Sequence, residues 1–189
     1  MKRNAEAEKD ISKLEAGFRR FVHDALPIAI AKLGVKVTPP TVDVFVVPDS
    51  YWLKLRDNAW AKTATQEEWM NAKAVAIYTP TSFSDRLRAS IELQHTDKNH
   101  NYDKNMDYNA VVFLRRGTLV KGEEERTVLE FYASLASASF SLAIATHFGR
   151  YSVCPITDPF NDRNAEEAMG ILTAPLTPER FAQRYGPQD

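Results

Sequence analysis

The sequence has a single cysteine, Cys154, among its 189 residues. No disulfide can therefore form within the chain, which suits a reducing compartment, and we expect a cytoplasmic protein. The thiol lies in an apolar run between Val153 and Pro155, whereas reactive thiols need a polar, electropositive setting. Cys154 is predicted to be a buried structural residue and not a nucleophile.

The chain also has few long apolar runs. Its longest uncharged stretch, 131–146, is rich in serine and shorter than the roughly 20 apolar residues that span a bilayer. The first residues are charged and lead into a charged helix, without the apolar region of a signal peptide. We expect a soluble, intracellular protein that is not bound to a membrane.

An excess of either charge is missing as well. The chain has 24 Lys and Arg residues against 25 Asp and Glu residues, for a formal net charge of −1. A nucleic-acid-binding domain normally has a basic surplus, so a nucleic-acid partner is not expected. Apolar residues make up 44% of the chain and charged residues 26%, which is typical of a globular protein.

Recognisable catalytic motifs are lacking too. The seven glycines are scattered, so no glycine-rich loop is available to bind phosphate, and G-x-S-x-G, H-E-x-x-H and Walker patterns do not occur. His147 stands at the end of a predicted helix, where a base suits the helix dipole. We predict no catalytic residues, no cofactor and no metal.

Oxygen-bearing side chains are concentrated in one segment, 95–107, where Asp or Asn occupies every second position from Asp97 to Asp107. The first half of this segment fits a calcium loop, but Tyr102 stands where that loop needs glycine and Tyr108 where it needs a closing glutamate. Asp and Asn also favour turns. The segment is predicted to be a solvated hairpin tip that binds no cation.

Two further groupings of residues have some features of a binding site. Glu92 and His95 have the spacing of a di-iron helix pair, but they fall on a predicted strand, where residues three apart point to opposite faces. The arginines of the predicted hairpin form a small basic patch of the kind used to bind nucleic acid. They are Arg86, Arg88, Arg115 and Arg116. Arginines on an exposed strand more often keep that strand soluble.

Hydrophobic periodicity and turn residues divide the chain into elements. The predicted strands are 42–47, 73–79, 86–94 and 108–116, with the last two forming a hairpin across the segment 95–107. The predicted helices are about 5–27, 28–33, a short helix capped by Thr65 and Glu68, 123–147, 162–172, and one opened by Thr177 and Pro178. Pro27 is expected to kink or break the first helix.

This element order predicts an α+β fold, because strands cluster in the middle of the chain and helices at both ends. We expect a mainly antiparallel sheet of about four strands, covered by the long small-residue-rich helix and the N-terminal helix. The chain is expected to form a single domain, 1–189. Alternatively, residues 157–189 form a small helical appendage to it.

Segment 49–64 has no strong periodicity beyond one helical turn from Ser50 to Leu55, and it contains Tyr51, Trp52 and Trp60. Long irregular connections are often functional, and these residue types dominate interface hot spots. Tyr51, Trp52 and Trp60 are therefore predicted to bind a partner. The alternative is that the indoles pack inward as part of the core.

The functional expectation follows from these observations. We expect a non-enzymatic interaction or assembly protein, a subunit of a larger complex, with a protein partner or further copies of itself. Two alternatives stay open. One is an enzyme of an unrecognised family, a hydrolase with its polar site near segment 95–107 or His147. The other is a nucleic-acid-associated module that uses the arginine patch.

Overall fold

The computed structural model describes residues 2–57, 64–81, 108–117, 122 and 124–187. Its described strands form one sheet in the order β1-β3-β2-β4. They are β1 (Val42–Val47), β2 (Ala74–Tyr78), β3 (Ala110–Arg115) and β4 (Ser152–Ile156). β1 and β3 are parallel, whereas β2 is antiparallel to β3 and to β4. The predicted α+β class with a mostly antiparallel sheet is confirmed.

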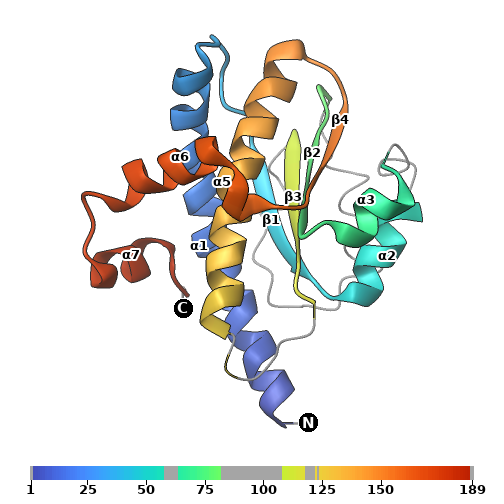
Figure 1. Cartoon of the computed structure of the whole chain (residues 1–189), viewed down its shortest axis with the longest axis vertical. Coiled ribbons are helices and arrows are strands. Elements are labelled where there is room, and N and C mark those ends of the chain that lie inside the picture. The colour runs from blue at the N-terminus through green and yellow to red at the C-terminus, as the bar shows by residue number, and fades with distance from the viewer. Residues whose placement is uncertain (1, 58–63, 82–107, 118–121, 123, 188–189) are drawn as a thin grey trace.

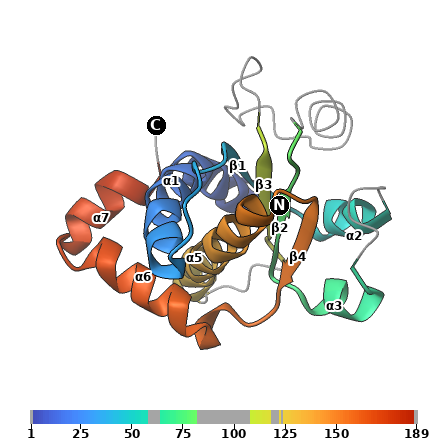
Figure 2. The same ribbon diagram turned by 90° about the horizontal axis from the view of Figure 1, so that it is seen from above.

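The sheet lies between two helical layers, as Figures 1 and 2 show. Alternate strand residues such as Val44 and Val112 pack against the long helices α1 (Lys2–Leu33) and α5 (Glu124–Phe148). The residues between them, such as Phe45 and Phe113, pack against α2 (Asp49–Asp57) and α3 (Gln66–Asn71). Both faces are therefore buried, which explains the nearly continuous apolar sequences of β1, β2 and β3.

The predicted hairpin between 86–94 and 108–116 is wrong. β3 is paired with β1 on one side and with β2 on the other, so neither edge is open to another strand. Residues 86–94 and the segment 95–107 lie outside the described residues, and the predictions of a hairpin tip without a cation there stay predictions. The described sheet instead gains β4, which the sequence reasoning did not identify as a strand.

Helix α1 runs without interruption from Lys2 to Leu33 and contains Pro27, so the predicted break there is wrong. Proline removes one backbone hydrogen bond, but Leu26 and Ala29 on either side are buried in the core. We attribute the continuity of the helix to this tertiary packing. The predicted end of the helix at residue 33 is confirmed, because the next residue, Gly34, has φ +70°, a conformation that glycine adopts readily.

Helix α5 is the central helix, as predicted. It packs against α1, against the sheet and against the C-terminal helix α6 (Arg163–Thr173), and Ala136, Ala138 and Ser139 are buried. The Ser139 hydroxyl donates to the Leu135 carbonyl at 2.8 Å, so this buried hydroxyl has a hydrogen-bond partner. The stretch Thr127–Phe148 has the length and composition to cross a membrane, but 67% of its most apolar window is buried inside the protein.

The C-terminal elements are η1 (Pro159–Asn161), α6 and α7 (Pro178–Tyr185). Asp162 caps α6 by accepting from Ala165 N at 3.2 Å, and its other oxygen accepts from the Ser137 hydroxyl of α5 at 2.8 Å. An ion pair between Lys32 and Glu167 joins α1 to α6. These contacts hold the C-terminal part of the chain against the two long helices.

Candidate functional site

Two of the three residues predicted to bind a partner lie in the core between α2, α3 and the sheet. Tyr51 is 3% exposed and Trp52 is fully buried. The Trp52 indole stacks on that of Trp69 with 4.3 Å between ring centroids. Each indole N–H donates to the other residue's carbonyl, at 3.0 and 2.8 Å. Tyr51 and Trp52 therefore pack inward as part of the core, which was the alternative to partner binding. Trp60 lies outside the described residues, and its role stays a prediction.

Segment 49–57 forms the helix α2 and not the irregular connection that the sequence predicts. Arg115 at the end of β3 fastens it, donating to both carboxylate oxygens of Asp49 at 2.9 and 3.3 Å. The same guanidinium donates to the Met70 carbonyl at 2.9 Å and lies over the Trp52 ring. The hydrogen bond from Arg115 lowers the pKa of Asp49 despite opposition from burial. Arg115 thus has a structural use within the fold.

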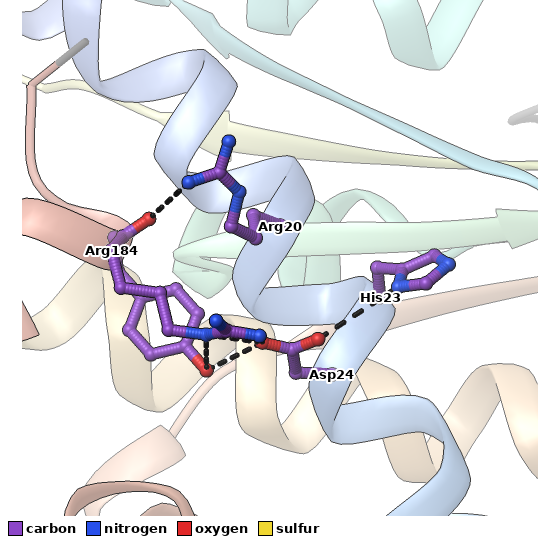
Figure 3. A network of polar contacts seen from close by, with 5 residues as sticks. Arg20, His23, Asp24 and Arg184 are labelled. Carbon is purple, nitrogen blue, oxygen red and sulfur yellow. Dashed lines mark hydrogen bonds and ion pairs between the residues drawn. The ribbon is translucent and has the colours of Figure 1, made fainter. Parts of the chain in front are cut away.

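A second polar network joins α7 to α1 and is drawn in Figure 3. We call Asp24, Arg184 and Tyr185 the latch. One oxygen of Asp24 accepts from the Tyr185 hydroxyl at 2.6 Å and from two nitrogens of Arg184 at 2.9 and 2.8 Å. Arg20 adds a bond to the Arg184 carbonyl at 3.2 Å, and the His23 imidazole lies 3.8 Å from Asp24.

The latch resembles a catalytic constellation in its residue types, but its geometry serves to hold α7 in place. Burial raises the pKa of Asp24, yet the hydrogen bonds from Tyr185 and Arg184 outweigh it, and the net pKa is below the ordinary 3.8. Burial and the bond to Asp24 raise the pKa of Tyr185 above its ordinary 10.0. Beneath the latch, Tyr132 donates to the Tyr185 carbonyl at 2.5 Å.

These shifts predict how the latch responds to pH. A carboxylate with a lowered pKa contributes stability above pH 3.8 that is lost as pH falls through the folded-state pKa. A tyrosine with a raised pKa contributes stability below pH 10.0 that is lost as pH rises further. Asp24→Asn should therefore lower the free energy of unfolding at neutral pH. The difference in this free energy between the variant and wild type should shrink below pH 3.8. Urea unfolding measured from about pH 3 to pH 7 would contradict this if the difference stayed constant.

Buried charges also connect α1 to the sheet. Asp43 of β1 is fully buried and Glu15 is 2% exposed. Asp43 accepts from its neighbour Val44 N at 2.7 Å, and the guanidinium of Arg19 lies 3.7 Å away. Glu15 precedes Arg19 by one helical turn and so shares its face of α1. Among the described residues no group of three or more His, Cys, Asp or Glu side chains could hold a metal ion.

Four of the large apolar side chains that the described residues expose lie on segments that adjoin strand β4 in the sequence or on helix α5, which packs against it. Ile144 and Phe148 at the end of α5 are 44% and 65% exposed, Tyr151 in the following loop 40%, and Phe160 of η1 51%. α5 packs against both β4 and η1, and the Ser141 hydroxyl lies 3.3 Å from the Cys154 sulfur. We call these four side chains together with β4 the β4 surface.

β4 also stands at the end of the strand order, so no described strand pairs with its outer edge. Exposed apolar side chains that gather in one place are typical of protein interaction sites. Unpaired strand edges offer backbone hydrogen bonds to another chain. In the part of the chain that the structure describes, the β4 surface combines both features, and it is our candidate site.

Comparisons of the chain with protein-family models, with curated proteins and with solved structures found no match. The function therefore has to be inferred from the residues of the chain.

Sequence reasoning did not single out Ile144, Phe148, Tyr151 or Phe160. α5 is apolar on nearly all sides, so periodicity could not separate its buried face from its exposed one. One signal was present, however. Phe148 lies between His147 and Gly149 at the end of the helix, where Gly149 ends the helix and the chain turns away.

Proposed function

We propose that the protein is a non-enzymatic interaction or assembly protein of the cytoplasm, which binds a protein partner through the β4 surface. The observation that carries this proposal is the exposure of Phe148, Tyr151 and Phe160 around an edge strand. Aromatic residues are enriched at the centres of protein interfaces, where a few of them supply most of the binding free energy. The single cysteine supports a reducing location.

Two of the described ionisable networks support the same proposal, because each holds a helix in place. Asp24 pairs with Arg184 to hold α7, and Asp49 pairs with Arg115 to hold α2. Charges engaged in this way stabilise packing. The exposed parts of the apolar side chains of the β4 surface, in contrast, would gain about 25 cal/mol for each Å² that another surface removes from water.

Replacing Phe148 by serine tests the proposal. The side chain is 65% exposed, so the fold should keep its melting temperature. A hot-spot residue contributes about 2 kcal/mol or more, so the dissociation constant of the complex should rise by about 30-fold. Both self-association and binding of proteins recovered from the source cytosol should be measured, with the recovered proteins identified and quantified.

The matched control is Ile171→Ser. Ile171 lies on α6 and is 56% exposed, so it is an apolar surface residue outside the β4 surface. Its substitution should leave both kinds of association unchanged. If Phe148→Ser and Ile171→Ser behave alike, or if wild-type chain associates with nothing, the proposal is wrong.

A further inference from the structure

The backbone of β4 has a defined outward edge. Lys73 N donates to the Ile156 carbonyl at 2.7 Å, so the backbone groups of Ile156 point inward, toward β2. Residues of a strand direct their backbone groups to alternate edges, so Val153 and Pro155 point theirs outward. Pro155 has no N–H. Val153 is therefore the one residue of β4 that offers an outward donor.

The charges around β4 are arranged at its two ends. The strand Ser152–Ile156 contains no charged residue, and its short length and Pro155 are the features that protect its edge. Arg150 lies two residues before the strand and Asp158 two residues after it, and both are exposed. Opposite charges at equal distances from the strand centre suit an antiparallel pairing of two identical strands.

Such a pairing can be centred on Cys154. Val153 of each copy then lies opposite Pro155 of the other. The Val153 N–H donates to the Pro155 carbonyl, and this bond forms although the proline has no N–H of its own to donate. The antiparallel direction also brings Arg150 of each copy to the same end of the paired strands as Asp158 of the other. A two-fold axis makes every contact occur twice.

We infer that the partner of the β4 surface is a second copy of this chain, joined through antiparallel β4–β4 pairing in this register. The inference rests on the proposed function and names its partner. The sheet becomes continuous across the two copies. Phe148, Tyr151 and Phe160 flank the paired strands and are withdrawn from water. The missing donor of Pro155 limits the edge to a few hydrogen bonds, so the apolar and charged contacts determine the affinity.

Charge reversal tests the register. Arg150→Asp and Asp158→Arg each bring like charges together at both ends of the paired strands. Each variant should raise the dissociation constant of the dimer by at least about tenfold, measured by sedimentation equilibrium of the full chain. Combining the two should restore the wild-type constant to within about threefold, because the pairs then re-form with exchanged partners. Asp158→Arg also removes the hydrogen bond from the Asn161 side chain to Asp158, at 2.6 Å. The double variant lacks this bond too, so its recovery would show that the loss in the single variant came from the charges.

Cys154 provides a second readout, since it is the only thiol in the chain. In the proposed register the two Cys154 residues form a pair without backbone hydrogen bonds between them, at the close cross-strand separation that a disulfide can bridge. Diamide, which takes up two electrons and two protons as two thiols become a disulfide, should give a covalent dimer on a non-reducing gel. Arg150→Asp should reduce the amount of this product at the same chain concentration, and Arg150→Asp/Asp158→Arg should restore it.

The outcomes separate this inference from the proposed function. A chain that stays monomeric at every concentration and forms no covalent dimer overturns the inference. If such a chain still binds another protein in a Phe148-dependent way, the proposed function stands. A dimer that survives each single charge reversal, or that the double variant does not restore, also overturns the inference. Dimerisation and partner binding that are both indifferent to Phe148→Ser overturn the proposed function itself.

Discussion

Replacing Trp52 by alanine should lower the free energy of unfolding by about 3–5 kcal/mol, the range for removing a large buried aromatic side chain. Trp52 is fully buried and stacked on Trp69. The substitution also removes the donor to the Trp69 carbonyl and the ring beneath the guanidinium of Arg115. α2 and α3 should therefore loosen together. Chemical unfolding followed by circular dichroism measures the loss.

The matched control is the adjacent residue on α2. Leu53 is 48% exposed, so Leu53→Ala should change stability by no more than about 0.5 kcal/mol. If Trp52→Ala also leaves stability within this range but weakens association with a partner, then Trp52 acts as an interface anchor, as the sequence first suggested, and the packing described for α2 and α3 is contradicted.

Replacing Gly17 by alanine should destabilise the packing of α7 on α1. A Cβ atom at Gly17 would lie 2.1 Å from the Tyr185 carbonyl oxygen and 2.6 Å from that of Gly186. Both are backbone atoms, so α7 itself has to move. That movement would break the bond from Tyr132 and disturb the latch. We expect a loss of about 1–3 kcal/mol, as for overpacking in a core, together with faster proteolysis in the loop 174–177.

Gly170 is the control for this substitution, because it is also helical and a Cβ there would meet nothing within 4 Å. Alanine is favoured over glycine inside helices by about 1 kcal/mol, so Gly170→Ala should be neutral or stabilising. Equal melting temperatures for the Gly17→Ala and Gly170→Ala variants would mean that α7 does not pack on α1 as described.

Elements governed by local sequence were predictable. β1 has the predicted bounds, Val42–Val47, because its apolar run ends at a proline that cannot continue a strand. α5 follows closely, since acidic residues begin it and Gly149 ends it with φ +63°. Thr65 caps α3 by accepting from Glu68 N at 3.2 Å, as its capping-box pattern indicated.

Elements governed by distant contacts were not predictable. The parallel pairing of β1 with β3 joins segments far apart in sequence, and strand periodicity does not reveal which strands are neighbours. β4 was missed because Pro155 disfavours a strand, although an edge position tolerates it when its nitrogen faces outward. α2 was predicted only as one helical turn from Ser50 to Leu55, whereas the helix extends over Asp49–Asp57 and buries Tyr51, Trp52 and Leu55.

The burial of Tyr51 and Trp52 was not predicted, for a related reason. Aromatic composition pointed to Tyr51 and Trp52, but composition does not distinguish a residue that anchors a partner from one that anchors a helix. Only the fold decides which aromatic residues stay exposed. It buries Trp52 fully and leaves Phe148 65% exposed, and the proposed partner-binding surface moves from α2 to β4 accordingly.

Amide hydrogen exchange at Val153 tests the central claim most directly. Its N–H points away from β2, so it should exchange readily in a dilute chain and be protected wherever a partner pairs with the β4 edge. We predict that exchange slows by at least about tenfold as the wild-type concentration rises through the association range, and that Phe148→Ser removes this protection. Exchange at Val153 that is equally fast in the free and the associated chain would contradict binding through the β4 surface.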